Sequence, residues 1–147
     1  MEFYKYHSLG NDYLVYDIRK NQEELDQEKI VRVCSRNFGI GSDGIVAGPY
    51  EKDGNMYVRV FNPDGTEAEQ GGNALRIFAH YLKAIGDIQK ESFELYTKSG
   101  ISQIRYLNRE GNRIQMTMGK LRFSSKALGL SGPDREAVHE FFNFGGE

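Results

Sequence analysis

Cysteine is almost absent from the sequence: Cys34 is the only one among 147 residues. A single thiol excludes an internal disulfide framework and a zinc site built from several thiolates, and it suits a reducing compartment. The three histidines, His7, His80 and His139, have no metal-ligand spacing and no carboxylate beside them in a metal-binding pattern. We therefore predict that the chain binds no metal.

Long apolar runs and a strong net charge are also lacking. No window of about eighteen apolar residues occurs, and residues 1–5 do not have the basic-then-apolar pattern of a signal peptide. The 19 Lys and Arg residues nearly balance 21 Asp and Glu residues, and the signs are interspersed along the chain. We expect a cytoplasmic protein with no membrane partner and no nucleic-acid partner.

The residues that are present suit one folded domain. Hydrophobic residues make up 39% of the chain and charged residues 27%, which at this length predicts a globular domain with an apolar core. Seven runs rich in β-branched and aromatic residues have the character of strands. They are residues 2–7, 12–18, 44–50, 56–61, 93–97, 101–107 and 113–118.

Turn residues and helical spacing predict how these strands connect. Glycine-containing turns at residues 53–55, 99–100 and 110–112 favour antiparallel hairpins and argue against a parallel, doubly wound sheet. Two helices are expected at residues 22–37 and 73–85, and the apolar face of the second should pack inside a curved sheet. From residue 122 the pattern weakens, and we expect a short helix at 134–142.

The segment from Gly39 to Gly44 has the G-x-G-x-x-G spacing of a dinucleotide-binding loop. Such a loop follows a strand and opens a helix, because the phosphate lies at the amino terminus of the helix. Here a helix precedes the glycines and a strand follows them. We interpret the segment as a tight helix-to-strand turn.

Two clusters of small and polar residues are candidates for a binding site. Gly71 and Gly72 allow the backbone to approach a ligand, and the free amides that open the next helix favour a carboxylate. A sharp turn with Asn73 as helix cap explains the same residues without a ligand. In the other cluster, Asn11 is either a turn residue beside Gly10 or an amide that binds a substrate carboxylate.

Several separated motifs, in this order and spacing, resemble the diaminopimelate epimerase family. They are His7-Ser8-Leu9-Gly10-Asn11-Asp12-Tyr13, Gly39-Ile40-Gly41-Ser42-Asp43-Gly44 and Phe61-Asn62-Pro63-Asp64-Gly65-Thr66-Glu67-Ala68-Glu69, extended by Gly72-Asn73, Arg76, Met118-Gly119-Lys120 and Arg122-Phe123. The resemblance implies an α+β fold of two similar lobes, each a mixed, mainly antiparallel curved sheet around a long central helix. It implies that residues 1–121 are the amino-terminal lobe, and that residues 122–147 begin the connection to a second lobe or are its remnant.

The resemblance also implies a chemistry, the isomerisation of LL- to meso-diaminopimelate in lysine and cell-wall precursor synthesis. In that family two cysteines, one from each lobe, face the substrate α-carbon from opposite sides and exchange its proton. Neither pyridoxal phosphate nor a metal is needed, so we expect no cofactor. Because an amino-acid α-proton is weakly acidic, the site must desolvate its thiolate and stabilise carbanion-like charge with helix-end amides.

Carried over to this chain, the resemblance gives a substrate site without its first thiol. The implied substrate-binding residues are Asn11, Asn62, Gly71, Gly72 and Asn73. The first catalytic cysteine of the family matches Gly71, so we identify no catalytic residue. Ala74 also replaces a usual glycine, and the polar residue that some members have near Gly44 is absent. Cys34 matches a helix position that is often cysteine but not catalytic, and its apolar neighbours predict a buried, inert thiol.

Three functions remain open at this point. The leading hypothesis is a cofactor-independent amino-acid epimerase or racemase, as one lobe or a divergent form, in which water or Glu69 acts opposite the other lobe's thiol. The second is a non-catalytic amino-acid-binding homologue, and the third is an isomerase of the phenazine-biosynthesis type with a different base. As partners we expect a small amino-acid substrate and either a second lobe or a second copy of the chain.

Overall fold

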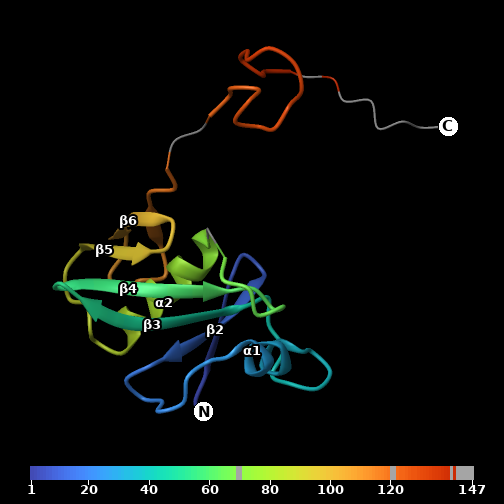
Figure 1. Cartoon of the computed structure of the whole chain (residues 1–147). Helices are drawn as coiled ribbons and strands as arrows, with labels where there is room; N and C mark the ends of the chain where they lie inside the picture. Colours follow the sequence, from blue (N-terminus) through green and yellow to red (C-terminus); the bar gives the residue numbers. More distant parts are fainter. Residues whose placement is uncertain (69–70, 120–121, 140, 142–147) are drawn as a thin grey trace.

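The computed structural model describes residues 1–68, 71–119, 122–139 and 141, and within them it consists of one curved sheet and two helices (Figure 1). The strands are β1 (Tyr4–Ser8), β2 (Asn11–Asp17), β3 (Ile45–Lys52), β4 (Asn55–Phe61), β5 (Ser92–Thr97), β6 (Gly100–Tyr106) and β7 (Ile114–Met116). The helices are α1 (Gln27–Cys34) and α2 (Gly72–Ala84). All seven predicted strands are confirmed, with ends that differ by a few residues.

The sheet keeps the order of the chain, β1 to β7, and it is mixed. The pairs β1–β2, β3–β4, β5–β6 and β6–β7 are antiparallel, which confirms the hairpins predicted from the turn residues. The pairs β2–β3 and β4–β5 are parallel. A parallel pair needs a crossover connection, and α1 and α2 are those crossovers. The predicted α+β class, a mixed and mainly antiparallel sheet, is confirmed.

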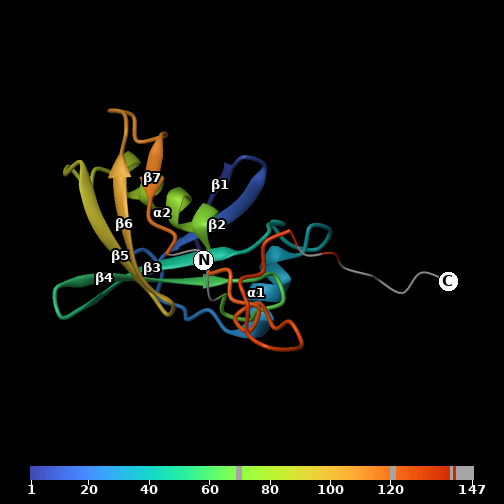
Figure 2. The same cartoon turned by 90° about the horizontal axis from the view of Figure 1, so that it is seen from above.

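Helix α2 lies in the concave side of the sheet, as Figure 2 shows. It contacts β1, β2, β3 and β7, so that both edge strands reach it. The core on this side includes Val15, Val58 and Val60 from the strands and Phe78 and Leu82 from the helix, all nearly inaccessible to solvent. The prediction that this helix packs inside a curved sheet is confirmed.

Helix α1 covers part of the opposite face of the sheet. Its buried residues Ile30 and Cys34 pack against a second apolar cluster that includes Leu14 and Ile45. The helix is shorter than the predicted 22–37 because the Asp26 carboxylate accepts a hydrogen bond from the Lys29 amide (2.8 Å) and caps it there. Strands β2 and β3 carry consecutive buried residues, as expected for strands that are covered on both faces.

A buried carboxylate ties the end of β2 to α2. The Asp17 side chain is fully buried and accepts hydrogen bonds from the Tyr81 hydroxyl (2.8 Å) and from Arg19 (2.6 Å and 2.9 Å). Arg19 also pairs with Asp87, beyond the end of the helix. Burial alone raises the pKa of Asp17, but the hydrogen bonds from Arg19 and Tyr81 outweigh it and bring the pKa below its ordinary value.

The segment 122–139 forms a small loop structure instead of the predicted helix. Ser124 and Glu136 form an isolated β-bridge, and the Ala137 amide donates to the Phe123 carbonyl (2.6 Å). These contacts hold residues 136 and 137 beside 123 and 124, so the helix predicted at 134–142 is wrong for its described part; residues 140 and 142 lie outside the described residues. Neither helix in the described part of the chain is long and apolar enough to cross a membrane.

Candidate functional site

The candidate site lies where the amino terminus of α2 meets one end of the central strands. Leu14 of β2 and Phe61 of β4 are both register partners of Ile45, the first residue of β3. Asn11, at the start of β2, and Asn62, directly after β4, therefore lie at the same end of the sheet. The next helix in the chain, α2, begins at Gly72.

The helix starts without a side-chain cap. Gly71 is the N-cap residue, and its carbonyl accepts the first intrahelical hydrogen bond, from the Leu75 amide (2.8 Å). The alternative in which Asn73 caps the helix is wrong, because the Asn73 side chain bonds elsewhere. The first amides of a helix have no acceptor within the helix and form the positive end of its dipole. The backbone of Gly72 and Asn73 is thus suited to an anionic group.

Asn11 and Asn73 are in direct contact although 62 residues separate them. Asn73 Nδ2 donates to Asn11 Oδ1 (3.1 Å), and Asn11 Nδ2 donates to Asp43 Oδ2 (2.8 Å). Arg76, one turn further along α2, donates from Nη1 to Asn73 Oδ1 (2.7 Å). Two residues predicted for the substrate site therefore share one network with Asp43 and Arg76.

Asp43 is held from its other side by charged groups. Arg36 Nη2 lies 2.7 Å from Asp43 Oδ1 and 2.7 Å from Asp12 Oδ1, and Lys5 Nζ lies 3.1 Å from Asp12 Oδ2. The hydrogen bonds from Arg36, together with those from Lys5, hold the pKa of Asp12 well below its ordinary value. Sequence reasoning missed Asp43 because it lies within the glycine motif that was interpreted as a turn.

Asn62 belongs to a turn of its own. Its Nδ2 donates to Thr66 Oγ1 (3.0 Å), and its backbone amide donates to the Thr66 carbonyl (2.8 Å). The Gly65 amide closes the turn on the Asn62 carbonyl (3.0 Å). The structure thus brings Asn62 to the same end of the sheet as Asn11 but does not join it to Asn73 by a described hydrogen bond.

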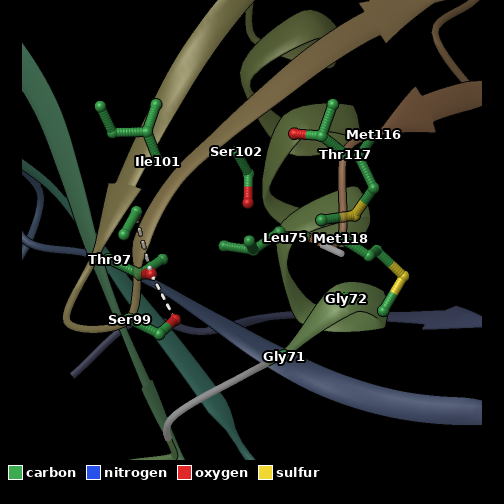
Figure 3. Close-up of a pocket in the computed structure, with 12 residues that line it drawn as sticks. Gly71, Gly72, Leu75, Thr97, Ser99, Ile101, Ser102, Met116, Thr117 and Met118 are labelled. Carbon is green, nitrogen blue, oxygen red and sulfur yellow. Dashed lines mark hydrogen bonds between the residues drawn. The ribbon is translucent and has the colours of Figure 1, made fainter. Parts of the chain in front are cut away.

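A cavity of about 120 Å³ opens at the amino terminus of α2 (Figure 3). Figure 3 shows Thr97, at the end of β5, and Ser99, in the turn between β5 and β6, on one side, and Met116 and Met118 on the other. The described lining consists of Gly71, Gly72, Leu75, Thr97, Ser99, Gly100, Ile101, Ser102, Met116, Thr117, Met118 and Gly119. None of these side chains is charged, so the cavity offers hydroxyl groups and backbone amides. Its hydroxyl residues were not predicted.

Position 71 faces packed neighbours on the sheet side. A β-carbon built there would lie 3.0 Å and 3.2 Å from the two γ-carbons of Val60 and 3.3 Å from the Ala74 β-carbon. The φ angle of Gly71 is −149°, which any residue can adopt. The backbone therefore does not require glycine here, but the packing favours it.

A side chain at position 44 would meet closer neighbours than one at position 71. A β-carbon there would lie 2.3 Å from the Phe61 carbonyl oxygen and 2.6 Å from Tyr13 Cε1. Glycine is thus required at position 44 by the close approach of β4 and the Tyr13 ring.

Cys34 lies away from this network, in the core beneath α1. It is 4% exposed, and its sulfur lies 3.4 Å from the Ser42 hydroxyl. Burial raises the pKa of the Cys34 thiol, which keeps it protonated and unreactive. The predicted burial is confirmed. Glu69, considered as a proton-transfer group, lies outside the described residues.

The fold of the chain is similar to that of solved proteins of the PhzF family. A phenazine biosynthesis protein of the PhzF family from Bacillus anthracis is similar with a TM-score of 0.56, at 19% identity over 79% of this chain and 40% of that one. A PhzF-family protein from Enterococcus faecalis is similar with a TM-score of 0.52, at 17% identity over 71% of this chain and 40% of that one. These likenesses show that the chain has the fold of part of a PhzF-family protein.

Sequence comparison identifies the family. The diaminopimelate epimerase family model matches residues 3–124. Diaminopimelate epimerase 2 from Nostoc sp. is 45% identical over 141 residues, which cover 95% of this chain and 49% of that protein. Diaminopimelate epimerase from Pelotomaculum thermopropionicum is 34% identical over 99% of this chain and 54% of that protein. The chain belongs to the diaminopimelate epimerase family, and it spans about half the length of these relatives.

Proposed function

We propose that the chain is the amino-terminal lobe of a cofactor-independent amino-acid epimerase of the diaminopimelate type. Residues 1–121 form the lobe, and residues 122–147 begin the connection to a second lobe or are its remnant. The contact between Asn11 and Asn73 at the amino terminus of α2 carries the proposal. Asn73 lies in the first turn of α2, directly after Gly71 and Gly72, so the two carboxamides lie near the helix-end amides, a set of donors that suits an amino-acid carboxylate.

In this proposal Asn11, Asn62, Gly71, Gly72 and Asn73 form one wall of the substrate site. The α-carboxylate binds at the helix amino terminus, where fixed N–H dipoles also stabilise the charge that develops when the α-proton leaves. A thiolate supplied by the second lobe takes the α-proton, the electron pair of the broken bond delocalises into the carboxylate, and water or Glu69 delivers a proton to the opposite face. Conversion of LL- to meso-diaminopimelate for lysine synthesis in the cytoplasm is the reaction that we propose.

Gly71 supports a second candidate, a non-catalytic amino-acid-binding homologue. Glycine has no group that can take or deliver a proton, so this wall of the site binds without catalysing. The packing of Val60 and Ala74 around Gly71 is consistent with a site that has adapted to the absence of a side chain. The carboxylate site at the helix amino terminus is common to both candidates.

Proton exchange in deuterated water separates the two candidates. The chain is incubated with LL- and meso-diaminopimelate, glutamate and histidine, and the α-proton signals are followed by NMR, with Asn73→Ala as the control. If the α-proton signal of one amino acid disappears with the original chain but not with Asn73→Ala, the epimerase is supported. Persistent signals together with calorimetric binding fit either the binding homologue or a half-site that lacks its second lobe, and the same assay on a complete two-lobe form separates these two. A chain that neither exchanges nor binds any of these amino acids contradicts the proposed site.

A further inference from the structure

Four side chains beside the amino terminus of α2 form one continuous line of hydrogen bonds, which we term the carboxamide relay: Arg76, Asn73, Asn11 and Asp43. Arg76 donates to Asn73 (2.7 Å), Asn73 donates to Asn11 (3.1 Å), and Asn11 donates to Asp43 (2.8 Å). Each bond runs in the same direction, from the guanidinium to the carboxylate.

The two ends of the relay allow only this direction. A guanidinium has five N–H donors and no acceptor, whereas an ionised carboxylate has acceptors only. If the Asn73 carboxamide were reversed, its NH₂ group would face the Arg76 donor and its oxygen would face Asn11 Oδ1. A reversed Asn11 would likewise set its oxygen against the Asp43 carboxylate. The charged ends therefore fix the orientation of both carboxamides.

Asp43 is itself anchored, so the acceptor end of the relay is rigid. Its Oδ2 also accepts the Asp12 backbone amide (3.1 Å), and its Oδ1 accepts Arg36 Nη2 (2.7 Å). Arg36 offsets the negative charge of Asp43, which would otherwise oppose an anionic ligand nearby. The Asn11, Asn73 and Asp43 bonds are partly buried, where hydrogen bonds between charged and polar groups are stronger than in water.

We infer that Asp43 and Arg76 are positioning residues that fix how Asn11 and Asn73 present their carboxamides to a ligand. Each Nδ2 uses one N–H within the relay and retains a second N–H, which is the group that a ligand carboxylate accepts from. Without the charged ends, either carboxamide can reverse and present a carbonyl oxygen, which repels a carboxylate. The identity of the ligand rests on the proposed function, but the orientation of the carboxamides does not.

A measurement without ligand tests the relay itself. Proton–nitrogen correlation spectra of the full chain report the side-chain NH₂ signals of Asn11 and Asn73. We expect Arg76→Met to shift the Asn11 signals and Asp43→Ala to shift the Asn73 signals, although neither pair is in direct contact through the relay. Arg105→Met is the matched control, because Arg105 is a cation that pairs with Glu91 and does not contact the relay. The relay would be overturned if Arg76→Met shifted only the Asn73 signals and Asp43→Ala shifted only the Asn11 signals.

A measurement with ligand tests the consequence for recognition. For the amino acid that the original chain binds, we expect Arg76→Met and Asp43→Ala each to weaken binding by about tenfold, the effect of losing one charge-assisted hydrogen bond. Arg76→Lys keeps a cation that only donates and should recover part of the affinity. Unchanged affinity in variants whose backbone spectra show an intact fold would overturn the positioning role. If the original chain binds no amino acid, the proposed function fails. The ligand-free NH₂ signals of Asn11 and Asn73 still show whether the relay exists.

Discussion

A cysteine introduced at position 71 would press its β-carbon against β4 and against the first turn of α2. The three nearest atoms are the γ-carbons of Val60, at 3.0 Å and 3.2 Å, and the Ala74 β-carbon, at 3.3 Å. Carbon atoms in van der Waals contact are about 3.5 to 4.0 Å apart. Each neighbour must therefore move by a few tenths of an ångström, and Val60, which is 4% exposed in the core, has little room to do so.

The expected cost of Gly71→Cys is about 1–2 kcal/mol of unfolding free energy, within the range for overpacked cores. Ala74→Gly alone should cost up to about 1 kcal/mol, because glycine has a lower helix propensity than alanine. In the double variant the smaller residue 74 relieves one of the three close contacts. We expect the combined cost to be smaller than the sum of the two single costs by about 0.5–1 kcal/mol.

Urea unfolding of the original chain, the two single variants and the double variant measures this coupling. Gly71→Ala is the matched control: it adds only the β-carbon, so it should cost about as much as Gly71→Cys. Strictly additive costs, or a Gly71→Cys variant as stable as the original chain, would refute the packing argument. In either case Gly71→Cys shows whether a thiol restores α-proton exchange, since a cysteine at a helix amino terminus has a lowered pKa.

Two further outcomes follow from the buried groups. Tyr81→Phe removes the hydroxyl that donates to Asp17, and it should lower the unfolding free energy by about 1–2 kcal/mol at neutral pH. Because the folded-state pKa of Asp17 is lowered, its stabilising contribution is full above a pH of about 4 and is lost as pH falls through the lower folded value. Urea unfolding at several pH values should show a weaker acid dependence in Tyr81→Phe, and an unchanged dependence would contradict this linkage. The Cys34 thiol should react with a disulfide reagent only after unfolding, whereas fast reaction in the native chain would contradict its burial.

The fold could be predicted largely because the sequence signals are local. Runs rich in β-branched and aromatic residues predicted each strand, and the turn at Asp53 and Gly54 predicted the hairpin of β3 and β4, which the structure confirms. The start of α1 was missed because the cap at Asp26 decides it, and one side-chain hydrogen bond outweighs the helical spacing upstream. The helix predicted near Asp134 was wrong, because a bridge between Ser124 and Glu136 holds that segment in a loop.

The candidate site could be predicted only in part from the sequence. The motifs gave Asn11 and Asn73, but their contact joins residues far apart in the chain and depends on how the sheet curves around α2. The role of Asp43 could not be read from a glycine-rich turn, because its partner Asn11 lies 32 residues away. Asn62 shows the converse: its motif is recognisable, yet its described hydrogen bonds remain within its own turn.

The most direct test of the proposed amino-acid site is a titration of the isotope-labelled chain with meso-diaminopimelate, followed in proton–nitrogen correlation spectra. We expect the largest saturable shifts at the backbone amides of Gly72 and Asn73 and at the Asn11 carboxamide, and we expect Asn73→Ala to reduce them. Absence of saturable shifts, or shifts centred on another surface such as the Cys34 side of the sheet, would contradict an amino-acid site at the amino terminus of α2.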